Sequence, residues 1–240
     1  YALFLAKSIT IMAFFIVAII LLFSLVYRQS VENNDRLKVR SLNKQYEDYK
    51  STMQSELLTS KNFKKWLADE KKQHKDPDEA TRPRLFILKF DGDIKANAVD
   101  SLREEITAII LAQQPNDEVL LRLESPGGHM HAYGLAASQL ERVKRSGMKL
   151  TIAVDNIAAS GGYMMACVAH HIIAAPFAML GSIGVIGQVP NIHRLLEKHH
   201  VDVELHTAGK YKQTLTLLGK NTDEGRNKFK EELTEAHQLF

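Results

Sequence analysis

Cysteine is nearly absent from this sequence of 240 residues, which contains one, Cys167. A single cysteine excludes a disulfide within the chain. Its apolar neighbours predict a small buried side chain, not a catalytic thiol, because no charged residue lies near enough in sequence to lower the thiol pKa. A strong net charge is also missing: the sum is +3, and no stripe of lysine and arginine interleaves with aromatic residues. The sequence therefore lacks the basic patch that is typical of nucleic-acid-binding proteins. We expect no nucleic-acid partner, no metal and no cofactor.

Near the N-terminus, an apolar run without charged residues extends from Ile9 to Tyr27. At 1.5 Å per residue, a helix over this run spans about 28 Å, enough to cross the hydrocarbon core of a bilayer. A cleaved signal peptide is the alternative. However, the run is longer than a typical signal-peptide apolar region, and the residues after it lack an Ala-x-Ala-like cleavage site. We expect a retained transmembrane anchor over residues 1–28.

The basic residues around this run bear on the side of the membrane that the remaining chain occupies. One lysine precedes the run and five basic residues follow it, which by the positive-inside rule favours a cytoplasmic location for the bulk of the chain. These residues are Lys7 before the run and Arg28, Arg36, Lys38, Arg40 and Lys44 after it. The chain begins with Tyr1 instead of Met, and Phe240 interrupts a helical pattern. We interpret it as a fragment, truncated at its C-terminus, whose flanking charges are incomplete.

Residues 29–83 change to a composition rich in Lys, Glu, Asp, Gln and Asn, with sparse apolar residues at helical spacing. Such charged runs are usually solvated, so the pattern predicts a partly helical stalk. The stretch from Lys71 to Asp78 is typical of a linker, and Pro83 ends it. We therefore expect three regions: an anchor over 1–28, a stalk and linker over 29–83, and a catalytic domain over 84–240.

From Arg84 onward, apolar runs of strand length alternate with amphipathic helical patterns, which is typical of an α/β fold with a parallel sheet and flanking helices. We find no internal repeat. The expected strands are 85–90, 119–123, 150–154, 172–174, 185–187 and 203–206. The expected helices are 98–111, 133–144, one from Ser160 to Ala169, and one that begins at Thr222 or Asp223.

Two glycine turns follow expected strands and precede expected helices, at residues 125–128 (Ser-Pro-Gly-Gly) and 159–162 (Ala-Ser-Gly-Gly). Strand ends of this kind meet at one edge of an α/β sheet. A serine attacking a peptide carbonyl creates an oxyanion that needs fixed backbone N–H donors, and glycine permits the close approach. We expect Ser160 as nucleophile and the amides of Gly128 and Gly161 as oxyanion hole. The first turn, taken alone, also fits a plain type II turn.

The base that would activate Ser160 is not given by the common hydrolase signature, since Ala158 replaces the first glycine of Gly-x-Ser-x-Gly. Among the histidines, His129 and His131 beside the glycine turn remain to be tested. A lysine serves as base only when burial lowers its pKa towards about 7 to 8. Lys212 lies in an unusually apolar stretch and is the favoured lysine, with Lys210 two residues before it.

Four motifs in this order resemble the signal peptide peptidase A family of membrane-bound serine proteases, and the N-terminal anchor and charged stalk look most like its SohB branch. They are Ser-Pro-Gly-Gly (125–128), Ala-Ser-Gly-Gly-Tyr (159–163), Gly-Ser-Ile-Gly-Val-Ile (181–186) and Gly-Lys-Tyr-Lys (209–212). The resemblance implies a ClpP/crotonase-like fold and a dyad of Ser160 and Lys212. It further implies that Ser182 orients the lysine and that Gly128 and Gly161 form the oxyanion hole. Gln213 departs from the family pattern, in which an acidic residue follows the catalytic lysine.

The expected function is that of a membrane-anchored serine endopeptidase that cleaves extended peptide segments, with signal-peptide remnants or membrane-protein fragments implied by the resemblance. The resemblance also implies a homo-oligomeric ring and a catalytic domain on the periplasmic side of the bacterial inner membrane, against the charge pattern. Two alternatives remain open. A crotonase-like enzyme acting on acyl-CoA would use similar backbone donors without a serine nucleophile, and a membrane scaffold would keep the fold without catalysis.

Overall fold

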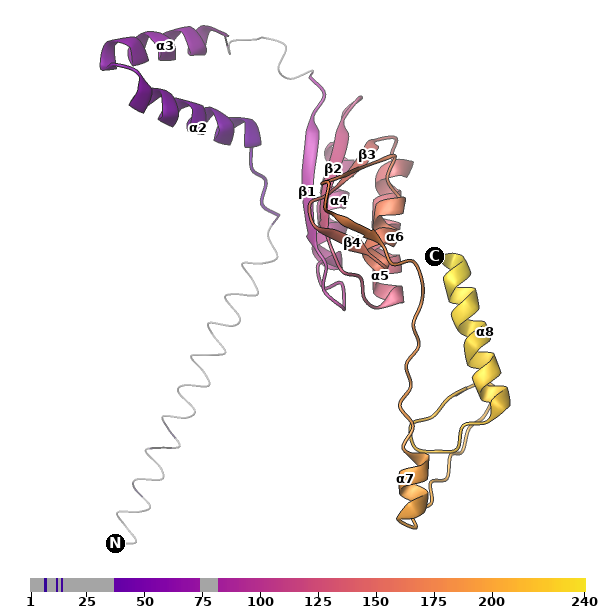
Figure 1. The fold of residues 1–240 in the computed structure, drawn as a ribbon. Coiled ribbons are helices and arrows are strands. Elements are labelled where there is room, and N and C mark those ends of the chain that lie inside the picture. The colour runs from indigo at the N-terminus through magenta and orange to yellow at the C-terminus, as the bar shows by residue number, and fades with distance from the viewer. Residues whose placement is uncertain (1–6, 8–11, 13, 15–36, 74–81) are drawn as a thin grey trace. The chain divides into compact units, whose positions relative to one another are not determined.

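The computed structural model describes residues 7, 12, 14, 37–73 and 82–240. The expected anchor over 1–28 lies outside the described residues, apart from three single positions. Within the described residues, no helix combines the length and the apolar character needed to cross a bilayer. The chain forms two compact units, residues 1–82 and 83–240 (Figure 1).

Among the described residues of the first unit are the helices α2 (Leu42–Leu57) and α3 (Ser60–Gln73). Ser41 caps α2, because its hydroxyl accepts a hydrogen bond of 3.3 Å from the backbone N–H of Lys44. Lys50 of α2 forms an ion pair with Glu70 of α3 and lies over the ring of Trp66, 5.6 Å from its centroid. These contacts join the two helices, and the helical spacing predicted for the stalk is confirmed here.

The second unit is built on a parallel sheet of four strands in the order β1-β2-β3-β5. The strands are β1 (Leu85–Asp91), β2 (Glu118–Glu124), β3 (Lys149–Val154) and β5 (His171–Ala174). Helix α4 (Val99–Ala112) connects β1 to β2, and α5 (Met130–Arg145) connects β2 to β3. The predicted α/β fold with a parallel sheet and flanking helices is confirmed.

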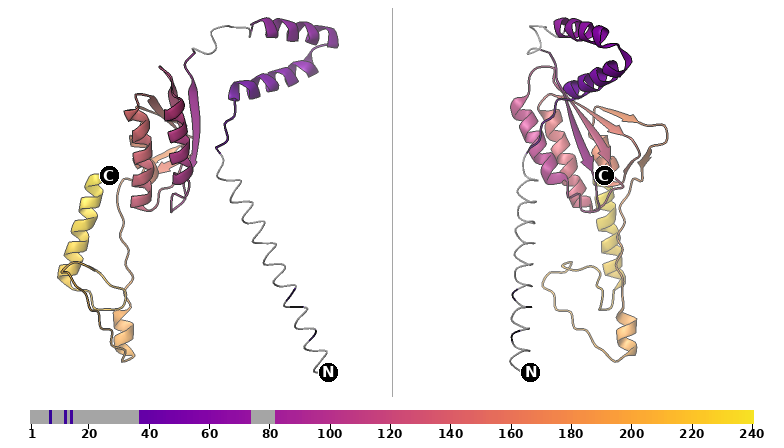
Figure 2. Two further views of the ribbon diagram at one scale, coloured as in Figure 1. Left: turned by 180° about the vertical axis from the view of Figure 1, so that it is seen from behind. Right: turned by 90° about the vertical axis from the view of Figure 1, so that its left-hand side faces the viewer.

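Helices α4 and α5 lie on one side of this sheet (Figure 2). In β1 and β2, buried residues alternate with more exposed ones, as a sheet covered on one face requires. The buried side chains of this face include Phe90, Leu121, Leu123 and Ile152, which pack against Ile106 and other apolar residues of the helices. The sheet and its two helices therefore form a single one-sided core that holds the strand ends in place.

A second, two-stranded parallel sheet continues from the carboxyl ends of the first. It pairs β4 (Ile157–Ala159) with β6 (Met179–Gly181), and a bridge joins Ser125, just after β2, to Ala158. The short helix α6 (Gly161–Cys167) follows β4 directly. Cys167, expected to be buried, is exposed, because the last residue of α6 faces away from the core that Met165 and Ala166 enter.

The remaining residues form α7 (His193–Lys198), a long loop and α8 (Asp223–Leu239), which is capped by the predicted Thr222. The predicted strands 185–187 and 203–206 were wrong, since both stretches are irregular. A β-branched apolar run forms a strand only beside another strand, and these runs have none among the described residues. Gly187 instead lies against Phe229 and Leu233 of α8, where a larger side chain would overlap the Phe229 ring.

Candidate active site

Ser160 occupies a sharp turn between β4 and α6. Its backbone has φ 50° and ψ −122°, a region that residues with a Cβ seldom adopt. Holding one such residue costs about 1 to 3 kcal/mol, which the surrounding structure must offset. Part of that offset is visible, since the Ser160 N–H donates a 2.8 Å hydrogen bond to the carbonyl of Gly181 in β6. Strain of this kind is typical of a nucleophile presented at the start of a helix.

The Ser-Pro-Gly-Gly turn lies directly against Ser160. Gly127 has φ 88°, and a Cβ built on it would approach the Ser160 Cβ to 2.7 Å and the Gly161 nitrogen to 2.9 Å. A Cβ on Gly128 would overlap the carbonyl of Ile94. Because only glycine fits at both positions, the backbone of this turn reaches the nucleophile more closely than any other residue type would permit.

The two amides predicted for the oxyanion hole belong to Gly161, the residue after Ser160, and to Gly128, the residue after the Gly127 that lies against Ser160. In the described part of the chain, the Gly128 N–H donates no hydrogen bond. Gly161 is the first residue of α6, where backbone N–H groups have no partner within the helix and the helix dipole favours negative charge. Neither amide donates a backbone hydrogen bond among the described residues, as the prediction of an oxyanion hole requires.

Ser182 lies one residue beyond the paired positions Ala159 and Gly181 of the two-stranded sheet. The hydrogen bond from Ser160 to Gly181 continues this pairing, so Ser182 follows the residue to which Ser160 is bonded. Ser182 also has a positive φ, 53°. The short sheet therefore brings the two predicted serines into the same small region.

Lys212 lies in the irregular segment before α8 and is exposed. Its backbone N–H donates a 3.3 Å hydrogen bond to Gly209. Within the residues that the structure describes, the Lys212 side chain makes no hydrogen bond with Ser160 or Ser182. A single chain thus groups four of the five predicted site residues, and Lys212 is not joined to them.

The alternative lysine, Lys210, has partners that oppose a role as base. Its ammonium group lies 3.0 Å from a carboxylate oxygen of Glu224 and 5.1 Å from the centroid of the Tyr211 ring. The hydrogen bond with Glu224 raises the pKa of Lys210 above its ordinary value. A lysine whose charged form is favoured in this way is a poorer proton acceptor.

The two histidines beside the glycine turn stack on each other, with ring centroids 5.7 Å apart. His129 is the N-cap of α5, and both rings are exposed. Neither forms a hydrogen bond with Ser160 among the described residues. In the described part of the chain, the geometry therefore gives neither His129 nor His131 the contact with Ser160 that a base requires.

One residue that the sequence analysis did not single out, Tyr133, completes the surroundings of the turn. The Tyr133 hydroxyl lies 2.6 Å from the Ser125 hydroxyl and donates a 2.8 Å hydrogen bond to the carbonyl of Asp93. The spacing of Tyr133 within the predicted helix fits an ordinary core position. The sequence therefore carries no separate signal for the hydrogen bonds of its hydroxyl with Ser125 and Asp93.

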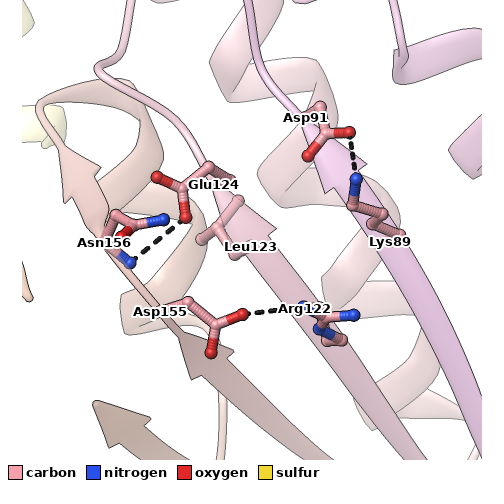
Figure 3. A pocket seen from close by; sticks show the side chains of 7 residues that line it. All are labelled: Lys89, Asp91, Arg122, Leu123, Glu124, Asp155 and Asn156. Atoms are coloured by element: carbon pink, nitrogen blue, oxygen red, sulfur yellow. Dashed lines mark hydrogen bonds and ion pairs between the residues drawn. The ribbon is translucent and has the colours of Figure 1, made fainter. Parts of the chain in front are cut away.

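A polar pocket of about 150 Å³ lies on the sheet near the carboxyl ends of β1, β2 and β3. Figure 3 shows that its charges are paired: Lys89 with Asp91 at 2.6 Å, and Arg122 with Asp155 at 2.8 Å. The carboxylate of Glu124 accepts a 3.2 Å hydrogen bond from the Asn156 N–H. None of the predicted catalytic residues lines this pocket, and its paired charges are those of a solvated sheet face.

Comparison with protein families matches the N-terminal model of peptidase family S49 over residues 1–140 and the peptidase family S49 model over residues 142–240. The chain belongs to peptidase family S49. This membership confirms the resemblance that the four motifs predicted.

Relatives in family S49 match along the whole chain. The sequence is 48% identical to a probable protease SohB of Buchnera aphidicola subsp. Schizaphis graminum, over 100% of this chain and 72% of the relative. It is 45% identical to the probable protease SohB of Haemophilus influenzae, again over 100% of this chain and 72% of the relative. Among solved structures, a ClpP1 mutant from Listeria monocytogenes matches with a TM-score of 0.26 and 16% identity, over 38% of this chain and 47% of that chain.

Proposed function

We propose that this chain is a membrane-anchored serine endopeptidase that uses a dyad of Ser160 and Lys212. The observation that carries the proposal is the strained backbone of Ser160 at the start of α6, pressed against the turn that contains Gly127 and Gly128. Membership of peptidase family S49 supports the reaction class. The relatives named as proteases support it as well.

The mechanism follows from the chemistry of these groups. The Ser160 oxygen attacks the peptide carbonyl carbon while a neutral Lys212 amine takes the hydroxyl proton. The carbonyl oxygen becomes an oxyanion that accepts hydrogen bonds from the amides of Gly128 and Gly161. The C–N bond breaks when the lysine returns the proton to the leaving amine. The same lysine then takes a proton from water, whose oxygen attacks the acyl-serine carbonyl, and gives that proton to the Ser160 oxygen as the ester C–O bond breaks. The Ser182 hydroxyl orients the lysine amine in both halves.

The proposed substrate is an extended peptide segment, such as a signal-peptide remnant or a fragment of a membrane protein. In the described part of the chain, β6 pairs only with β4, and it ends next to Ser160. The unpaired edge of β6 offers backbone groups to an extended peptide, as in other cases of strand addition. Small apolar side chains of the substrate suit the shallow surroundings of a partly exposed serine.

The proposed assembly is a homo-oligomeric ring. From Ser182 to Phe240 only Gly219 is buried, and Lys212 is not joined to Ser160 within one chain. A head-to-tail contact between identical chains buries such a surface, and it closes into a ring when the rotation between neighbours permits. We propose that this contact encloses Lys212 near Ser160. We also propose the apolar run Ile9 to Tyr27 as the anchor, with the catalytic domain on the periplasmic side of the inner membrane.

The proposal is tested with a fluorophosphonate serine probe on the full-length protein, solubilised in detergent, with intact mass as the readout. We expect one adduct per chain and loss of peptide cleavage in parallel. Ser160→Ala should abolish both, by about 10³-fold or more in rate, while the thermal midpoint stays unchanged. Ser182→Ala keeps Ser160 and should still be labelled there, but more slowly, because it lacks the hydroxyl that orients Lys212.

Two outcomes would contradict the proposal. Absence of labelling together with absence of cleavage would favour an inactive scaffold. Binding of acyl-CoA without labelling of Ser160 would favour a crotonase-like enzyme, which needs the backbone donors and no serine nucleophile.

A further inference from the structure

Tyr133 contacts three separate loops of the proposed active site from a fully buried position. Its hydroxyl reaches Asp93 in the loop after β1 and Ser125 in the loop after β2. Its ring lies against Gly161, where any Cβ would overlap the aromatic carbons. The ring also makes an edge contact with Phe90, 6.4 Å between centroids. One side chain of α5 therefore connects the strand ends, the glycine turn and the start of the nucleophile helix.

The direction of the hydrogen bonds around Tyr133 is fixed by counting protons. A carbonyl only accepts, so the single Tyr133 proton is donated to Asp93. The Ser125 hydroxyl must then donate its own proton to the Tyr133 oxygen, and its oxygen accepts a 3.0 Å hydrogen bond from the Gly127 N–H. The chain of donors runs from Gly127 through Ser125 and Tyr133 to Asp93. Burial raises the pKa of Tyr133, so the hydroxyl stays protonated as this chain requires.

This chain of hydrogen bonds determines which amide of the glycine turn is left for a substrate. The Gly127 N–H is consumed by Ser125, whereas the Gly128 N–H has no acceptor among the described residues. On the far side, the His129 N–H donates a 2.8 Å hydrogen bond to Ile94, whose carbonyl lies where a Gly128 side chain would be. Because hydrogen bonds hold the turn on both sides of Gly128, the direction of the Gly128 N–H is fixed.

We propose that Tyr133 is a positioning residue of the oxyanion hole: through Ser125 it fixes the Gly128 amide, and through its ring it fixes Gly161. The inference rests on the proposed function, because the oxyanion in question is the one that forms when Ser160 attacks a peptide carbonyl. It goes beyond that function by naming a residue that never touches the substrate. Preorganised donors act on the transition state more than on the bound substrate, so the loss of this support should appear in kcat.

The test is Tyr133→Phe in the full-length protein, which keeps the ring against Gly161 and removes only the hydroxyl. We expect kcat to fall about 10- to 100-fold, somewhat less than the loss of a whole oxyanion-hole donor, with KM within about twofold. Affinity for a peptide boronate, which mimics the tetrahedral intermediate, should fall by a similar factor, while affinity for the product peptide stays the same. Tyr163→Phe is the matched control. Tyr163 lies in α6, the helix that follows Ser160, but the neighbour of its hydroxyl is Cys167 and not the glycine turn.

A second readout does not depend on activity. Backbone hydrogen exchange of the segment 125–129, followed by mass spectrometry, should be faster in Tyr133→Phe and unchanged in Tyr163→Phe. Unchanged exchange, or a kcat and boronate affinity equal to those of the unmodified protein, would overturn the role of Tyr133. Equal losses of product and boronate affinity would also overturn it, since they indicate general disruption. If the unmodified protein cleaves no peptide but Tyr133→Phe shows the faster exchange, the proposed function is contradicted, whereas the support that Tyr133 gives to the glycine turn is confirmed.

Discussion

Two stretches of the same compact unit, residues 83–181 and 182–240, use apolar side chains in opposite ways. All buried hydrophobic residues of the described chain lie between Leu88 and Ala166. Beyond residue 181, large apolar side chains are exposed instead: Ile183, Ile186, Val189, Ile192, Leu195, Val201, Val203, Leu205, Tyr211, Leu217, Leu218 and Leu239. The first stretch has a buried apolar core of its own, although single residues such as Leu111 and Phe177 are exposed, and the second stretch has no buried large apolar side chain.

This difference separates the two proposed catalytic groups. Ser160 belongs to the stretch that is complete within one chain, and its backbone geometry is already set. Lys212 belongs to the second stretch, whose large apolar side chains are exposed in the single chain. We propose from this difference that the nucleophile and the oxyanion hole are set within a single chain, whereas the base becomes functional only when chains assemble.

The largest expected effect is that of Lys212→Ala. Loss of the general base should lower the rate of peptide cleavage by about 10³-fold or more, measured with a fluorogenic peptide at saturating concentration. Lys210→Ala is the matched control in the same segment. Its ion pair with Glu224 is exposed, and exposed pairs contribute little, so the cleavage rate of this variant should stay within about fivefold of the unmodified rate. If Lys210→Ala loses activity and Lys212→Ala keeps it, Lys212 is not the general base.

The next effect concerns the uncovered apolar surface. Ile186 is 92% exposed in the single chain, so Ile186→Glu should not unfold it, but a carboxylate placed in an apolar interface carries a large desolvation cost. We expect this variant to give smaller particles by light scattering and to cleave peptides at least about 10-fold more slowly. Leu111→Glu, at a residue 83% exposed in the first stretch, should keep both the particle size and the rate. Identical particle sizes for all three proteins would argue against the ring.

The sequence predicted the first stretch well because its signals are local. Apolar runs of strand length predicted the strands 85–90, 119–123 and 150–154, and apolar residues at helical spacing predicted the helices between them. The structure confirms these elements within a few residues. The strands β4 and β6 were not predicted, because three residues are too few to show a period. Their pairing is what places Ser182 near Ser160.

The second stretch was predicted less well for a related reason. Strands expected at 185–187 and 203–206 were read from β-branched apolar residues, but a strand depends on a neighbour that the sequence of one chain does not specify. The position of Lys212 relative to Ser160 depends in the same way on contacts far apart in sequence. Tyr133 was missed because its spacing predicts burial and says nothing about the hydroxyl.

The smallest expected effect separates stability from activity within the first stretch. Asp117 and Arg84 lie just before β2 and β1, at the end of the sheet opposite to the Ser160 turn. The buried Asp117 carboxylate pairs with Arg84 at 2.6 Å and accepts hydrogen bonds of 2.8 Å from the backbone N–H groups of Arg84 and Gln114. The Arg84 side chain is the largest cause that lowers the pKa of Asp117 to about 2. Asp117→Asn should reduce the free energy of unfolding at pH 7 by about 2 to 4 kcal/mol and leave kcat unchanged.

The pH dependence of this loss has a defined sign. A carboxylate with a lowered pKa in the folded state stabilises the protein fully above its unfolded pKa of about 4, and the contribution is lost as pH falls through about 2. The difference in unfolding free energy between the unmodified protein and Asp117→Asn should therefore shrink between pH 4 and pH 2 in urea titrations. Asp155→Asn is the matched control, because its pair with Arg122 is exposed and should contribute about 1 kcal/mol or less. A loss of kcat in Asp117→Asn would show that the two ends of the sheet are coupled, and equal stability losses in the two variants would contradict the buried pair as the cause.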